Sequence, residues 1–123
     1  MLSKTVRFAN LALAGMLAGN EFGTWAAVHP SLERLGLPER IRAEQELTRR
    51  FGAIMPAWMG SAVVSCLLAL LSYRGSAGFR STLLGTACLA GMLVSTRLGN
   101  VPINARVLQM DPERDQREFA GLR

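Results

Sequence analysis

Apolar residues in this chain gather in three long blocks instead of recurring at a short period. The blocks cover residues 8–28, 51–72 and 81–103, and each is 21 to 23 residues long. A helix rises about 1.5 Å per residue and needs about 20 apolar residues to cross a hydrocarbon core of roughly 30 Å. A soluble bundle would need charged outer faces, which these blocks almost lack. The pattern predicts an all-α domain over residues 1–123, a transmembrane bundle with three spans.

The first block can be compared with a secretory signal peptide, because two basic residues precede it. Lys4 and Arg7 resemble a basic leader, but Glu21 interrupts the run where a cleavage region would be small and neutral. A retained helix is therefore predicted. We expect it to end at His29-Pro30, since the residue before a proline resists helical geometry.

The segment before the second block predicts a polar extension of that helix outside the membrane. Pro38 suits the first turn of a helix, and charged residues follow it at helical spacing. One helix over residues 38–72 is expected, protruding into the cytoplasm or the periplasm. The expected ion pairs are Arg40–Glu44, Arg42–Glu46 and Glu46–Arg50. After the third span, the polar tail over residues 105–123 should begin a helix at Asp111-Pro112.

The net charge of +5 could suggest a nucleic-acid partner, but most of the 14 basic residues flank the apolar blocks. A lipid bilayer explains such flanks better, and no basic patch carries interleaved aromatic residues, so nucleic acid is not expected. Nine basic residues lie on the side where the first block ends and four on the other, which favours the first side as cytoplasmic. We expect an integral protein of a bacterial inner (plasma) membrane.

Two cysteines, Cys66 and Cys88, lie inside apolar blocks at similar depth, without a CxxC or Cys/His spacing. A metal cluster is therefore not expected. Two small buried thiols are favoured over a disulfide.

Each block carries one stripe of polar or small residues, and the three stripes are expected to face one another. Glu21 and Arg97 lie seven or eight residues from the same membrane boundary. A lone charge within a bilayer is costly, so these two residues are predicted to pair. The other members of the predicted pocket are Asn20, Trp25, His29, Trp58, Asn100 and Asn104. Two interpretations stay open: a ligand-binding pocket, or a polar lock that holds three helices in register.

Three stretches resemble the family of small membrane proteins that includes the anthrone oxygenases: AGNEFGTWAAVHPSL, the proline-led extension, and GNVPINARVLQMDP. The most specific part is the run NVPIN over residues 100–104, followed by Asp111-Pro112. Members of that family usually have a fourth transmembrane helix, and this chain stops at Arg123. The resemblance implies a fragment or short form, or a second chain that supplies the fourth helix.

The resemblance also implies oxidation of a flat, apolar, enolisable substrate by dioxygen. A base would remove a proton to give a delocalised enolate, which can pass an electron to dioxygen directly, so that no cofactor is required. Glu21 or His29 would be the base. The residues that would stabilise the enolate oxygen are Arg97, Asn100 and Asn104. Trp25 and Trp58 would stack on the rings of the substrate, and Asn20 would be a further substrate-binding residue.

Two other function classes stay open. A haem or metal oxidase would use His29 as a ligand, although one histidine without other soft ligands makes this difficult within one chain. A non-enzymatic membrane assembly factor or small transporter subunit would need these polar residues only to hold the three helices in register. An open side of the bundle, with a possible packing face at Gly15, Gly19 and Gly23, predicts a homo-oligomer or a partner chain.

Overall fold

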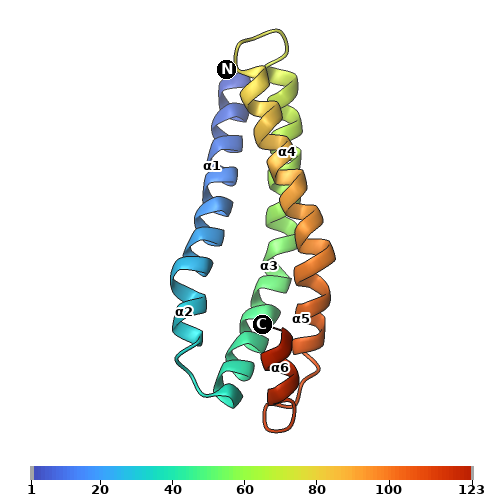
Figure 1. The fold of residues 1–123 in the computed structure, drawn as a ribbon. Coiled ribbons are helices and arrows are strands. Elements are labelled where there is room, and N and C mark those ends of the chain that lie inside the picture. The colour runs from blue at the N-terminus through green and yellow to red at the C-terminus, as the bar shows by residue number, and fades with distance from the viewer. Residues whose placement is uncertain (1, 123) are drawn as a thin grey trace. The chain divides into compact units, whose positions relative to one another are not determined.

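The structure is a computed structural model that describes residues 2–122, and the chain is helical along most of this length (Figure 1). Its elements in chain order are α1 (Leu2–Gly23), η1 (Thr24–Val28), α2 (His29–Leu32), α3 (Leu37–Ser72), α4 (Phe79–Ser95), η2 (Thr96–Asn100), α5 (Val101–Val107) and α6 (Gln116–Leu122). The elements η1 and η2 are π-helical segments. No β-strand occurs within residues 2–122, so the predicted all-α class is confirmed.

The second apolar block and its polar extension form one helix, as the charge spacing predicted. Helix α3 has 36 residues, which corresponds to roughly 54 Å at the usual rise. Two predicted ion pairs are present, Arg40–Glu44 at 3.2 Å and Glu46–Arg50 at 2.7 Å. The predicted Arg42–Glu46 pair is wrong. Arg42 reaches Glu113 in the tail at 2.6 Å, and Glu46 is occupied by two arginines further along α3.

Two stretches of the chain are long and apolar enough to cross a membrane: α3 and the continuous helical run Phe79–Val107. Few residues of the apolar part of α3 are buried, and none of α4 is. Exposed apolar helices of this length require lipid or another chain around them. Among residues 2–122, the first helix is not one of these candidates, and it also carries Lys4, Arg7, Asn10, Asn20 and Glu21. The third span stays a prediction.

The first helical run continues past the proline that was expected to end it. Helix α2 includes Pro30 in its first turn, where a residue needs no N–H donor. Before it, the N–H of His29 donates to the carbonyl of Thr24 in the π-helical pattern. The predicted end at His29-Pro30 is therefore wrong, because η1 accommodates the missing N–H of the proline.

The two π-helical segments share one sequence spacing. In η1, Thr24 precedes Pro30 by six residues, and in η2, Thr96 precedes Pro102 by six residues. In η2 the N–H of Val101 donates to the carbonyl of Thr96, which repeats the pattern of η1. Proline alone does not cause the segment, since Pro56 lies within α3 without one.

The chain forms two compact units. Unit 1 contains the chain up to Glu21 and residues Met55–Val94, and unit 2 contains Phe22–Ile54 and the chain from Ser95 onward. The chain leaves one unit and enters the other three times, and each of these crossings lies within two residues of an irregularity in a helix. These irregularities are η1, Pro56 and η2.

Unit 1 packs small residues of α3 against α1. Its buried residues are Leu17, Ala62, Ser65, Cys66 and Ala69. The side-chain amide of Asn10 donates to Ser65 Oγ at 3.2 Å and to Cys66 Sγ at 3.1 Å. The Ser65 hydroxyl in turn donates to the carbonyl of Ala62. Both cysteines are free, and Cys88 is exposed, so the prediction of two buried thiols holds only for Cys66.

Unit 2 has a core of larger side chains. Ile41 of α3, Val107 of α5 and Phe119 of α6 are fully buried and pack with Met110. Gln45 Nε2 donates to the carbonyls of Val107 and Met110, both at 2.9 Å, where α5 has ended. The Val107 carbonyl also accepts the N–H of Met110 at 3.2 Å, so the Gln45 amide adds a second donor there and supplies one to Met110 beyond the end of α5.

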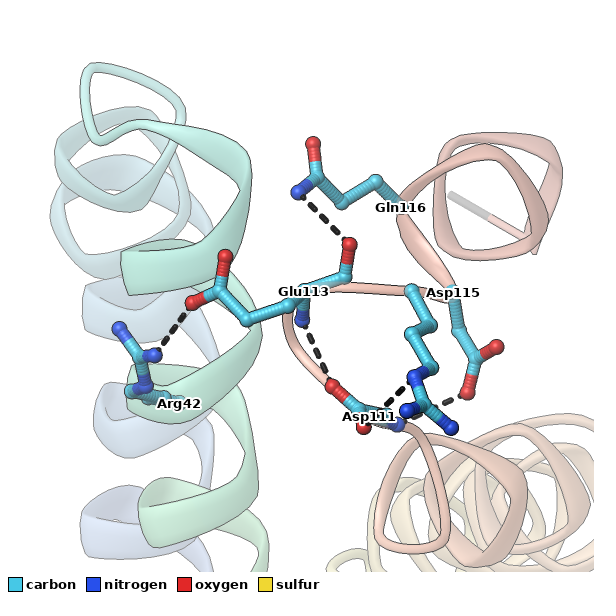
Figure 2. Close-up of polar contacts among 6 residues, drawn as sticks. Arg42, Asp111, Glu113, Asp115 and Gln116 are labelled. Atoms are coloured by element: carbon cyan, nitrogen blue, oxygen red, sulfur yellow. Dashed lines mark hydrogen bonds and ion pairs between the residues drawn. The ribbon is translucent and has the colours of Figure 1, made fainter.

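The turn between α5 and α6 is held by its own acidic residues (Figure 2). The carboxylate of Asp111 accepts the N–H of Glu113 at 2.9 Å, and that of Asp115 accepts the N–H of Asp111 at 2.8 Å. Helix α6 therefore begins at Gln116, and the predicted helix start at Asp111-Pro112 is wrong. An aspartate that binds the N–H two residues on forms a turn in place of a helix.

Candidate active site

The eight predicted pocket residues are divided between the two units. Three belong to unit 1, namely Asn20, Glu21 and Trp58. Five belong to unit 2, namely Trp25, His29, Arg97, Asn100 and Asn104. The pairing of Glu21 with Arg97 and the joining of all eight residues in one pocket stay predictions.

The unit 2 residues gather at the two π-helical segments. Trp25 lies inside η1 and His29 directly follows it. Arg97 and Asn100 lie inside η2, and Asn104 follows one turn later in α5. Single π-turns inside α-helices often occur at functional sites. The structure therefore associates most of the predicted site with the two irregular turns of the chain.

The aromatic and imidazole groups of the first segment differ in exposure. The Trp25 side chain is 71% exposed, and its ring lies 6.0 Å from that of Phe22, tilted by 46°. His29 is half-buried. An exposed indole beside a second ring offers an apolar surface on which a flat ring system can stack. A single imidazole nearby could accept or donate a proton.

The polar groups of the second segment are also accessible. Arg97 and Asn100 are exposed, and Asn104 is half-buried. Arg97 carries a fixed positive charge, and each asparagine carries an amide donor. These three groups together could stabilise an oxygen atom that becomes negatively charged.

The π-helical geometry changes how these side chains align. A stripe drawn at 100° per residue assumes a uniform α-helix. A π-turn bonds each carbonyl to the N–H five residues on, so it adds one residue to the turn. Residues before and after η2 are therefore rotated relative to the α-helical expectation. The sequence signal that could have revealed this rotation is the shared spacing of Thr24 with Pro30 and of Thr96 with Pro102.

A metal ion would need ligands from beyond this group. Among residues 2–122, no three histidine, cysteine or acidic side chains lie together in a way that could hold a metal. His29 alone supplies one nitrogen. A haem or metal held at His29 would therefore require a further axial or coordinating group from another molecule.

Two hollows on the described surface lie away from the predicted site residues. One, in unit 2, is lined by Ala105, Arg106, Gln109, Met110, Asp115 and Glu118, and an ion pair joins Arg106 to Glu118 within it. The other, in unit 1, is lined by Leu67, Leu70, Leu71, Arg74 and Phe79. The first is polar and carries both signs of charge, whereas the second is apolar with one arginine.

Comparison with known families decides where the chain belongs. A family model described as anthrone oxygenase matches residues 45–122, which is more than half of the chain. This chain belongs to the anthrone oxygenase family. The comparisons with curated proteins and with solved structures found no match. The resemblance inferred from the sequence is thus confirmed at the level of the family.

The match to the anthrone oxygenase family includes only part of the predicted site. Trp58, Arg97, Asn100 and Asn104 fall inside residues 45–122. Inside the match also lie Gln45, η2 and the whole core helix α6. The four predicted site residues that precede the match are Asn20, Glu21, Trp25 and His29.

Proposed function

We propose that this protein is a membrane-embedded oxygenase that oxidises a flat, apolar, enolisable ketone with dioxygen. The observation that carries the proposal is membership of the anthrone oxygenase family over residues 45–122. That range includes the exposed Arg97 and Asn100 of η2. An apolar tricyclic ketone partitions into lipid, which agrees with a site beside helices apolar enough to cross a membrane.

The proposed reaction balances without an added reductant. A base takes one proton from the methylene carbon, and the enolate passes one electron to dioxygen. The carbon radical and superoxide combine to a peroxide, which takes up the proton. Loss of the second C–H proton then breaks the O–O bond and gives a carbonyl and one molecule of water. The methylene is oxidised by four electrons, and dioxygen is reduced by the same four.

The residues divide into three roles. Glu21 or His29 acts as the base that takes the first proton. Arg97, with Asn100 and Asn104, stabilises the negative charge on the enolate oxygen. Trp25 and Trp58 stack on the rings, and Asn20 is a further substrate-binding residue.

The proposal also includes the first helix as a third span, over residues 8–28, in a bacterial inner membrane. Large apolar side chains of α3 and α4 are exposed in the single chain, and apolar surface of this extent is normally covered by lipid or by another chain. This exposure supports a second copy or a partner chain that completes the bundle. Chemical crosslinking in membranes that yields only monomer would count against that part of the proposal.

Oxygen uptake by the full chain in lipid vesicles tests the activity. Anthrone should be consumed with one equivalent of dioxygen and converted to anthraquinone, faster than in empty vesicles. Arg97→Gln should lower kcat/KM by about 100-fold, as loss of an oxyanion partner does in other enzymes. Arg34→Gln is the matched control, because Arg34 is an exposed arginine in the turn before α3. Equal rates in protein and empty vesicles would refute the oxygenase and leave the non-enzymatic alternative.

Two further variants and a chelator separate the proposed roles. The turnover rates of His29→Gln and Glu21→Gln should differ, since only the replacement of the residue that acts as the base abolishes deprotonation of the substrate. A rate that disappears with chelator and returns with added metal would favour the metal-dependent alternative at His29. A rate unchanged in His29→Gln and Glu21→Gln would exclude both residues as the base.

Replacement of Pro102 tests whether the π-turn matters to the site. Pro102→Ala restores an N–H and should allow η2 to become α-helical, which rotates Arg97 relative to Asn104. We expect lower turnover without lower thermal stability. Pro112→Ala is the control, since Pro112 lies in the turn before α6. Equal activity of Pro102→Ala and the parent protein would show that the rotated geometry is not used.

A further inference from the structure

All four basic residues of unit 1 lie at one end of it. Lys4 and Arg7 belong to the first two turns of α1, Arg74 lies in the turn between α3 and α4, and Arg80 lies in the first turn of α4. The start of α1 and this turn lie at the same end of the unit (Figure 1). The sequence of unit 1 contains no acidic residue except Glu21, at the opposite end of α1. Positive charge at this end therefore has no counter-charge within the unit.

Arg7 ties the start of α1 to this turn. Its Nη2 donates to the carbonyl of Ser72 at 2.8 Å, and its guanidinium carbon lies 3.9 Å from the centre of the Tyr73 ring. Its Nε is buried without a hydrogen-bond partner. A partly buried cation without an opposing charge is costly, so an anion from outside the unit would be stabilising here.

An apolar hollow opens at the same turn. It has a volume of about 300 Å³ and is lined by Leu67, Leu70, Leu71, Arg74 and Phe79. Leu67 and Leu71 are exposed and lie one turn apart on α3, and Arg74 follows just beyond the helix. Along α3, the exposed leucines thus come first and the positive charge of Arg74 comes last, just beyond the end of a helix that is apolar enough to span a membrane.

We propose that this hollow binds an anionic phospholipid. One acyl chain lies along Leu67 and Leu71, and the phosphate lies at Arg74, within the positive field of Lys4 and Arg80. Charge complementarity selects the anionic lipid, and the order of apolar and basic groups fits a lipid in its normal orientation in the bilayer. The inference rests on unit 1 alone and does not depend on the proposed oxygenase activity.

Lipid titration of the full chain in nonionic detergent, followed by native mass spectrometry, tests the proposal. Phosphatidylglycerol and phosphatidylcholine with identical acyl chains are the two probes. We expect tighter binding of phosphatidylglycerol, and a loss of about fivefold in Arg74→Gln, which corresponds to about 1 kcal/mol for one basic residue near a membrane surface. Arg34→Gln removes the same charge in unit 2 and should change nothing.

A second pair of variants tests the acyl chain. Leu71→Ala should weaken phosphatidylglycerol binding, whereas Leu84→Ala, an exposed leucine of α4 outside the hollow, should not. Equal binding of the two lipids, or equal effects of Arg74→Gln and Arg34→Gln, would overturn the proposal. Competition by glycerol phosphate as strong as by the whole lipid would reduce the site to a phosphate site. A change of oligomeric state in Leu71→Ala without a change in lipid binding would assign the hollow to a second copy.

Discussion

The two units of this chain are stabilised in different ways although they share helix α3. Unit 1 buries mostly small side chains, with a polar link from Asn10 to Ser65. Unit 2 buries Ile41, Val107 and Phe119 and surrounds them with ion pairs. Close packing of small residues with interhelical hydrogen bonds is typical of helices in lipid. A core of large apolar side chains inside a charged shell is typical of a domain in water.

The comparison shows that α3 presents different surfaces along its length. Its first part carries the charges and the buried Ile41, and its second part carries the apolar surface that could cross a membrane. The division between the units lies beside Pro56, in the middle of the helix. One continuous helix therefore belongs to two kinds of core.

The largest expected effect is the loss of the aromatic ring at the centre of unit 2. Phe119→Ala should destabilise unit 2 by about 3–5 kcal/mol, because Phe119 is fully buried and its loss leaves a cavity. Hydrogen exchange should rise in α6 and in the first part of α3 and stay unchanged in α4. Phe8→Ala is the control, since Phe8 is exposed in unit 1. Equal loss of protection in both units would show that they unfold as one.

The amide of Gln45 gives the next largest effect. Gln45→Met keeps the length of the side chain but removes the amide that donates to the carbonyls of Val107 and Met110. We expect a loss of about 1–3 kcal/mol, since a buried carbonyl is left without its donor. Thermal unfolding in detergent measures the loss. Gln109→Met, at an exposed glutamine, should be neutral, and equal stability of both variants would show that water replaces the amide.

Much of the fold could be predicted from the sequence, because helical spacing and apolar length are local properties. The spacing of Arg40 and Glu44 predicted the extension of α3 correctly. The structure has two runs long and apolar enough to cross a membrane in residues 2–122, and the predicted count of three spans stays a prediction. Exposure of Cys88 could not be read from the sequence, because it depends on which helices pack on α4.

The sequence predicted which residue types form the candidate site, but it did not predict how those residues are oriented. The family could be identified from the run over residues 100–104, which lies inside the matched range. The relative orientation of Arg97 and Asn104 could not be predicted, because a helical wheel assumes a uniform α-helix and the chain forms the π-helical segment η2 there. Glu113 was likewise missed as the partner of Arg42, since a contact across 71 residues has no local signal.

A smaller effect is expected from the polar link in unit 1. A double-mutant cycle with Asn10→Ala and Ser65→Ala should give a coupling energy of about 0.6 kcal/mol, the usual size for hydrogen bonds between membrane helices. Thermal unfolding in detergent measures the four proteins. A coupling energy well above 2 kcal/mol would mean that unit 1 depends on polar contacts as strongly as unit 2, and the contrast between the two units would fail.

The smallest effect is expected from the exposed ion pair of α3. Arg50 and Glu46 are four residues apart, with 76% and 53% of their side chains exposed, so Arg50→Gln should cost only about 0.3–0.5 kcal/mol. Arg40 and Glu44 have the same spacing on the same helix, but Glu44 is 3% exposed and the Arg40 guanidinium lies over the Phe119 ring. Arg40→Gln should therefore cost several times more, because it removes a positively charged partner from a buried carboxylate. Unfolding of both variants at low and high salt separates the two cases, since salt screens only the exposed pair appreciably. Equal costs with equal salt dependence would show that unit 2 gains nothing from burying its charges, and that its stability comes from the apolar core alone.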